Sequence, residues 1–149
     1  MNPTDQSYAN VTSYRVIYGD TDQMGVVYYA NYLRWFETGR GELLRASGIP
    51  YVTIERRGMH FPVADLSCRY FRSAHYDDLI VIETRLALIS RASLTFTYRI
   101  LREAEVTLLA SGSTKHACVD DQGRITRIHN DLVQALERML KSTGDSVAI

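Results

Sequence analysis

The stretch that decides the fold is residues 18–40, which read YGDTDQMGVVYYANYLRWFETGR. The Asp, Thr and Gly residues in its first part are typical of turns and helix caps. After this turn the apolar residues recur at steps of three and four, which predicts an amphipathic helix over Val26–Ser47. Gly39 falls on the apolar side of that helix, where a missing side chain lets another element approach closely. The stretch therefore predicts a helix packed tightly across a sheet.

Strands are predicted on both sides of this helix. Ser13–Gly19 is rich in Tyr, Val and Ile, which favours a strand that leads into the turn. Alternating apolar residues predict further strands at 59–71, 79–90, 92–102, 106–119 and 124–128. The connections between them are short, as antiparallel hairpins require. With a short helical turn at 51–57 and a final helix after Asn130, this order predicts an α+β domain whose long helix covers one sheet face.

The composition is that of one ordinary globular domain. The chain has 149 residues, of which 46% are hydrophobic and 23% charged, enough for a core without disulfide support. Residues 1–12 and 142–149 lack apolar periodicity, so we expect a flexible N-terminal tail and a frayed C-terminus. Residues 13–141 are then the folded domain.

Charge and hydropathy argue against several classes of partner. Lys+Arg and Asp+Glu balance at 17 each, so no net field favours nucleic acid. No apolar run is long enough to cross a bilayer, and the N-terminus lacks the basic and apolar segments of a signal peptide. Cys68 and Cys118 belong to no cluster with metal-ligand spacing, so no metal is expected. We expect a cytoplasmic protein with no nucleic-acid partner and no membrane insertion.

The same stretch places carboxylates beside the start of a helix. Asp20 and Asp22 follow the predicted strand, and the first turn of a helix leaves N–H groups without partners. Thioester hydrolysis needs such a pair, because donors must hold the developing oxyanion next to a nucleophile or base. Gly25 removes a side chain where a ligand would approach the backbone. Two structural interpretations stay open, since an Asp before a helix is often its N-cap and an Asp-Thr-Asp loop can contribute to a cation site.

A resemblance to a known family adds to this interpretation. The stretch resembles the hotdog-fold thioesterases of the 4-hydroxybenzoyl-CoA thioesterase family in the pattern Asp22-x-x-Gly25-x-Val27, Tyr32, Glu37 and Arg40. It looks especially like the branch of the Tol-Pal-associated short-chain acyl-CoA thioesterases. A later match is Tyr70-x-x-x-Ala74-x-x-Asp77-Asp78-Leu79. The resemblance implies a hotdog fold, an antiparallel sheet wrapped around the long helix, in a homodimer or homotetramer.

The resemblance also implies roles for residues of the loop. The family's catalytic aspartate precedes the motif glycine by three positions, which matches Asp22 and Gly25. Its oxyanion donor is a backbone N–H at the start of the helix, which matches Tyr29. Asp22 would then attack the thioester carbonyl or activate a water, with no metal or cofactor. Many short-chain relatives carry His where Tyr29 stands, so the acyl group stays open between short-chain and aromatic.

Further residues are expected to contact the substrate: Val27, Glu37, His60, Arg91 and Ser93. Arg91 is what remains of a basic cluster that grips nucleotide phosphates in aryl-CoA relatives, so the carrier is either CoA or an acyl carrier protein. Glu37 and Arg40 stand at i, i+3, which is equally typical of a structural ion pair. His60 precedes a strand and titrates near neutral pH.

Two other functions stay open beside the thioesterase. A hotdog hydratase or dehydratase needs a His paired with a carboxylate, and residues 22–40 contain no His. A non-catalytic protein that binds acyl-CoA or acyl carrier protein is the other alternative, because a fold alone does not fix function. We expect an enzyme that hydrolyses an acyl-CoA thioester to a free acid and CoA.

Overall fold

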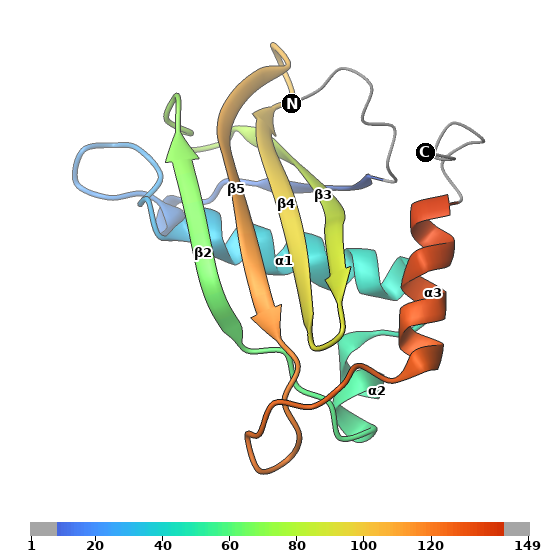
Figure 1. Cartoon of the computed structure of the whole chain (residues 1–149). Coiled ribbons are helices and arrows are strands. Elements are labelled where there is room, and N and C mark those ends of the chain that lie inside the picture. The colour runs from blue at the N-terminus through green and yellow to red at the C-terminus, as the bar shows by residue number, and fades with distance from the viewer. Residues whose placement is uncertain (1–8, 142–149) are drawn as a thin grey trace.

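The computed structural model describes residues 9–141 and contains one five-stranded antiparallel sheet, with strand order β1-β3-β4-β5-β2 (Figure 1). The strands are β1 (Asn10–Arg15), β2 (Val63–Tyr70), β3 (Leu79–Ser90), β4 (Ser93–Arg102) and β5 (Thr107–Ala117). The two central pairs, β3 with β4 and β4 with β5, are hairpin partners, as the short connections predict. β1 and β2 are the edge strands, so each has one side without a strand partner within the described residues.

The long helix α1 (Asn31–Ala46) crosses one face of this sheet (Figure 1). The side chains that alternate toward it from β3 and β4 are buried, whereas their neighbours are only half-buried. Phe36 of α1 stacks on Tyr98 of β4, with ring centroids 4.2 Å apart and planes inclined by 7°. This packing confirms the predicted α+β fold, in which a sheet wraps around the long helix.

Two glycines allow α1 to approach the sheet this closely. A Cβ atom at Gly39 would overlap the Thr84 hydroxyl and lie 2.9 Å from Cγ2 of Ile82. In β5, a Cβ atom at Gly112 would lie 2.7 Å from the ring of Phe36. Real Cβ atoms are not found this near to other atoms, so larger residues would push the layers apart. The close approach predicted at Gly39 is confirmed.

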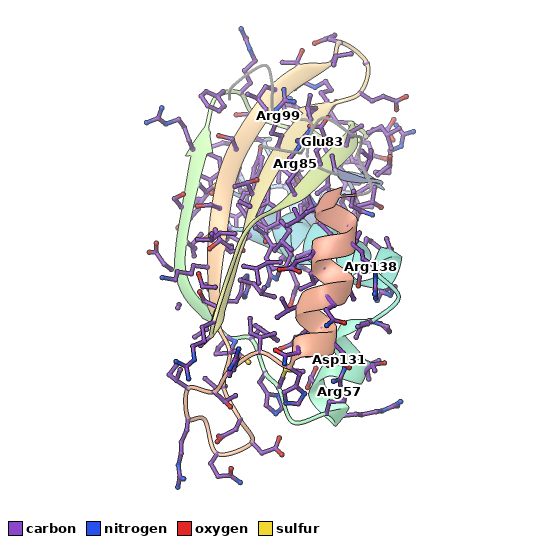
Figure 2. The ribbon with its side chains drawn as sticks, turned by 45° about the vertical axis from the view of Figure 1, so that its right-hand side comes forward. Arg57, Glu83, Arg85, Arg99, Asp131 and Arg138 are labelled. Carbon is purple, nitrogen blue, oxygen red and sulfur yellow. The ribbon has the colours of Figure 1, made fainter. Side chains whose placement is uncertain are left out.

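Of the two shorter helices, the first lies at one end of the molecule and the second starts near that end and runs along the side (Figure 1). They are α2 (Tyr51–Arg56) and α3 (Asn130–Lys141). Figure 2 shows Arg57 and Asp131 side by side, and their ion pair of 2.5 Å joins the end of α2 to the start of α3. None of the helices within residues 9–141 has the length and apolar character needed to cross a bilayer.

The sheet face opposite α1 is polar in its middle. Arg99 of β4 donates to the Glu83 carboxylate of β3 at 3.0 Å, and Arg85 lies 3.8 Å from the same carboxylate (Figure 2). The alternation of the strands thus sends apolar residues to α1 and charged residues outward. The contrast between the two faces is what the sequence pattern predicts.

Several boundaries differ from the prediction. The first strand begins at Asn10 rather than Ser13, because residues 10–12 pair with β3, so the expected tail 1–12 overlaps a strand at its end. Residues 1–8 and the predicted frayed end 142–149 lie outside the described residues. β2 begins at Val63, not at residue 59. The strand predicted at 124–128 is wrong, since only an isolated bridge between Val119 and Ile125 forms there.

The start of the long helix is the most important correction. The apolar pattern predicts a helix from Val26, whereas α1 begins at Asn31. The N–H of Val27 is bonded to the Ala74 carbonyl, and the N–H of Tyr28 to the Asp20 carbonyl, both at 2.9 Å. These hydrogen bonds to distant residues keep residues 26–30 out of the helix, because a helix would direct the same N–H groups to carbonyls of its own preceding turn.

Candidate active site

The loop before α1 is anchored by Asp20. Its side chain is 8% exposed and accepts hydrogen bonds from the Tyr14 hydroxyl at 2.7 Å and the Ile17 N–H at 2.9 Å. Its carbonyl accepts a further hydrogen bond from the Asn31 side chain at 2.8 Å. These contacts connect β1, the short 3-10 turn Tyr18–Asp20 and the first residue of α1. Asp20 is therefore a structural residue that fixes where the loop begins.

Asp22, two positions later, lies in a tight reversal of the chain. Its N–H is bonded to the Val26 carbonyl at 2.9 Å, and its carbonyl accepts from the Gly25 N–H at 3.0 Å. Gly25 has a φ of 79°, a left-handed conformation that favours glycine. One carboxylate oxygen of Asp22 accepts the Met24 N–H at 2.9 Å. The turn thus holds the carboxylate in place through one oxygen, and Asp22 does not cap α1.

Asp22 lines a cavity of about 310 Å³. Its walls come from the loop, the start of α1 and the end of β2, through Asp22, Met24, Val26, Val27, Tyr29, Tyr32, Tyr70, Phe71, Arg72 and Ser73. Its volume is in the range of small-ligand sites. The structure therefore brings together three residues that the sequence selects, namely Asp22, Val27 and Tyr29.

The backbone N–H of Tyr29, a residue that lines this cavity, is an available donor. It meets no hydrogen-bond acceptor within residues 9–141. The peptide group between Tyr28 and Tyr29, which contains this N–H, is fixed through its carbonyl. The Tyr28 carbonyl accepts the Asn31 N–H at 2.9 Å. The next carbonyl, that of Tyr29, accepts the Tyr70 hydroxyl at 2.8 Å. A free and fixed N–H donor is what an oxyanion site requires.

Tyr70 is a site residue to which the sequence assigns no role. Burial, followed by its contact with Cys68, raises the pKa of its phenol, so the hydroxyl stays protonated and donates to Tyr29. Tyr32 packs edge-on against the Tyr70 ring, with centroids 5.0 Å apart. The hydroxyl of Tyr32 accepts a hydrogen bond from the Ala74 N–H at 3.1 Å. The signal in the sequence is the Tyr at the end of a strand, but its distance from Tyr29 in the chain hides the contact.

The remaining predicted substrate residues lie away from this cavity in the same chain. Glu37 borders a second cavity of about 290 Å³ with Arg40, 4.0 Å from its guanidinium. His60 contacts Asp121 at 2.8 Å, near the start of β2. Arg91 is exposed in the turn between β3 and β4, and Ser93 opens β4. Their contact with substrate stays a prediction, and in one chain they do not border the Asp22 cavity.

Comparisons with known proteins identify the family and agree with the fold. The family model of the thioesterase-like superfamily matches residues 16–136. The chain is 38% identical over 107 residues to the acyl-CoA thioesterase YbgC of Haemophilus influenzae, covering 71% of this chain and 77% of the relative. It is 37% identical over 106 residues to the acyl-CoA thioester hydrolase YbgC of Shigella flexneri, covering 71% of this chain and 78% of the relative.

Solved structures share the fold. The DHNA-CoA thioesterase of Staphylococcus aureus matches with a TM-score of 0.85 at 28% identity, covering 95% of this chain and 97% of that one. A 4-hydroxybenzoyl-CoA thioesterase solved with bound 4-hydroxybenzoyl-CoA matches with a TM-score of 0.79 at 23% identity, covering 86% and 98%. At 23% identity, the match to the 4-hydroxybenzoyl-CoA thioesterase shows a shared fold alone.

Proposed function

Because this chain belongs to the thioesterase-like superfamily and is an acyl-CoA thioesterase of the hotdog fold, we propose that Asp22 is its catalytic carboxylate. The Tyr29 N–H is the proposed oxyanion donor. The observation that carries this proposal is that Asp22 and Tyr29 border one cavity, and that the Tyr29 N–H has no acceptor within residues 9–141. Gly25 adds no side chain at the mouth of the turn. Val27 supplies an apolar wall beside the reacting carbonyl.

The chemistry follows from this pairing. A thioester carbonyl in the cavity accepts the Tyr29 N–H, which stabilises the negative charge that develops on its oxygen. In one route a carboxylate oxygen of Asp22 attacks the carbonyl carbon, the C–S bond breaks, and CoA leaves as a thiolate. Water then hydrolyses the resulting mixed anhydride. In the other route Asp22 takes a proton from a water that attacks the same carbon, the C–S bond breaks, and CoA leaves as a thiolate with the free acid as the second product.

The proposed substrate is an acyl-CoA with a short-chain or aromatic acyl group. The thioesterases similar to this chain act on acyl-CoA and DHNA-CoA by their names, which supports a CoA thioester here. Arg91, exposed in its turn, is the proposed contact to the nucleotide phosphates, with Ser93 beside it. An acyl carrier protein is the alternative carrier.

The proposed active unit is a homodimer joined along β2. β2 is an edge strand whose apolar residues are exposed, with Val63 48%, Leu66 44% and Tyr70 44% exposed. Such an edge pairs readily with another strand. In a two-fold pair that uses the whole strand, Val63 of one copy lies opposite Tyr70 of the other. The Asp22 cavity of one copy then adjoins the Glu37 cavity of the other.

This dimer gives roles to residues that are remote within one chain. Phe61 and Val63 border the Glu37 cavity, whereas Tyr70 and Phe71 border the Asp22 cavity. In this dimer, the start of β2 of one copy therefore places the Glu37 cavity next to the acyl group that is bound at Asp22 of the other copy. His60, which directly precedes Phe61, approaches the same region. A homotetramer would consist of two such pairs.

Two variants of neighbouring aspartates test the proposal. Asp22→Asn should lower the rate of CoA release from acyl-CoA by about a hundredfold or more with little change in thermal stability, because it removes the reacting oxygen's charge. Asp20→Asn removes the same charge two residues away but weakens the anchoring hydrogen bonds, so it should lower stability instead. Free thiol is measured with a thiol-reactive dye over a panel of short-chain and aromatic acyl-CoAs.

The outcomes separate the candidate functions. Equal turnover of wild type and Asp22→Asn would overturn the role of Asp22. Hydration of an enoyl-CoA with no thiol release would favour a hydratase. Binding of acyl-CoA without any turnover would favour a non-catalytic binding protein.

A further inference from the structure

The second cavity, between α1, α2 and the starts of β2 and β4, has a mixed character. Most of its walls are apolar, from Leu44, Ile54, Phe61, Leu94 and Phe96. Its polar lining includes Glu37, Arg40 and His116. With about 290 Å³ it has room for a small acyl group but not for a nucleotide as well. The cavity is therefore a mostly apolar pocket that also contains a positively charged side chain.

This side chain is Arg40, and little negative charge lies near it to balance its positive charge. Its side chain is 18% exposed, whereas Glu37, 4.0 Å away, is 76% exposed. Along the described part of the chain, no other carboxylate lies within 4.0 Å of the Arg40 guanidinium. Solvent screens the charge of Glu37 much more than that of Arg40. A guanidinium that is mostly out of water is costly unless an anion contacts it.

The cavity floor offers Arg40 no anion. His116 is 2% exposed, and its Nδ1 lies 3.0 Å from the Phe61 carbonyl, which can only accept, so Nδ1 carries the proton. Nε2 of the neutral ring then accepts the Thr114 hydroxyl at 2.7 Å. The Thr114 oxygen in turn accepts the Tyr98 hydroxyl at 2.6 Å. This chain of hydrogen bonds is complete and uncharged.

Arg40 lines the same cavity as His116. Burial lowers the pKa of His116, and the charge of Arg40 lowers it further. Burial raises the pKa of Tyr98, and Arg40 acts against that rise. Both effects arise because the positive charge of Arg40 lies close to His116 and Tyr98. A neutral phenol can accept one hydrogen bond from Arg40, but it cannot balance the charge.

We propose that Arg40 binds a carboxylate at the far end of the acyl group, so that the enzyme prefers CoA monothioesters of dicarboxylic acids. This inference rests on the proposed function, in which the cavity of one copy adjoins Asp22 of the other. The methylene chain contacts the apolar walls, and the terminal carboxylate forms a charge-assisted pair with the guanidinium. Arg40 is thus a specificity-determining residue.

Matched thioesters test this preference. The probes are adipoyl-CoA against hexanoyl-CoA and suberoyl-CoA against octanoyl-CoA, which differ within each pair only by the terminal carboxylate. For the wild type, kcat/KM should be higher for the dicarboxylic member of at least one pair. Arg40→Met should reduce that preference by about tenfold to a hundredfold, because it removes a hydrogen bond between charged groups. Arg40→Lys keeps the charge and should retain part of the preference.

A control on the same helix isolates the effect. Arg45 is exposed and paired with Glu42 at 2.5 Å, outside the cavity, so Arg45→Met should leave the preference unchanged. Equal or lower kcat/KM for the dicarboxylic members in the wild type would overturn the inference, whether or not Arg40→Met folds. So would an unchanged preference in folded Arg40→Met. If instead no thioester is hydrolysed by the wild type, the proposed function itself fails.

Discussion

The two ends of α1 border cavities of opposite character. At its start the cavity is lined by a loop that contains Asp22 and Tyr29, whose N–H has no acceptor in the part of the chain that the structure describes. Along its second half the cavity is lined mostly by apolar side chains and contains a half-buried cation. In the function that we propose, one helix thus separates the groups that perform the chemistry from the groups that select the substrate. In a dimer joined along β2, each active site takes one end from each copy.

The difference also shows how each end is built. The start of α1 is positioned by backbone hydrogen bonds to distant segments, such as that of Val27 to Ala74. The second half is positioned by side-chain packing, with Leu43 1% exposed and Leu44 5% exposed. Backbone bonds fix an N–H donor in space, whereas packing shapes an apolar slot. Changes at the two ends should therefore have different consequences.

The largest expected effect comes from disrupting the proposed dimer, in which the start of α1 of one copy and the second half of α1 of the other form one active site. Leu66→Lys introduces a charge in the middle of β2, where the two copies of the strand would pair, so the dimer would have to bury an unpaired charge and should dissociate. Thioesterase activity should then fall by about a hundredfold or more at low protein concentration, because positioning by the second copy is lost. Sedimentation and thiol release measured on the same samples check this.

The matched control is Val52→Lys. Val52 is 53% exposed on α2, away from the β2 edge, so its variant should keep the assembly and the activity. A monomeric Leu66→Lys protein with full activity would contradict the composite site.

A smaller effect is expected where the middle of α1 touches the sheet. Gly39→Ala places a methyl group against Thr84 and should lower the free energy of unfolding by about 1–3 kcal/mol. Gly41→Ala meets only the Arg45 side chain at 3.9 Å, so it should instead raise the free energy by roughly 0.5–1 kcal/mol. Urea unfolding measures both. Thr84→Ala added to Gly39→Ala should recover part of the loss, and no recovery would mean that another contact is responsible.

The smallest effect concerns the ion pair that supports the end of the molecule near α2 and α3. The hydrogen bond from Arg57 holds the pKa of Asp131 below its ordinary value near 3.8. The pair therefore stabilises the fold above that value, and its contribution disappears as pH falls through the lowered pKa. Asp131→Asn should slightly reduce the melting temperature at neutral pH.

The same variant should match the wild type at a pH below the lowered pKa of Asp131, because the wild-type carboxyl is then protonated as well. A difference in melting temperature that persists there would show that the effect has another cause. Thioester hydrolysis should be unaffected at both pH values, since the pair lies apart from both cavities.

The sequence by itself determined the framework. Periodicity of 3.6 and 2 identified the long helix and the hairpin strands, since each pattern reflects which side of an element is buried. Gly39 on the apolar stripe indicated the close contact with the sheet, and the structure contains that contact. The loop residues Asp22, Val27 and Tyr29 were also identified from the sequence, and they border one cavity.

Only the tertiary structure decided the details that depend on distant segments. Local periodicity could not show that α1 begins at Asn31, because the bonds that hold residues 26–30 open come from Asp20 and Ala74. The low exposure of Arg40 was equally hidden, since its i, i+3 spacing to Glu37 fits an exposed pair as well. Sequence patterns report which face of an element is buried, whereas a site forms where several elements meet, and that meeting is fixed by the packing of the whole chain.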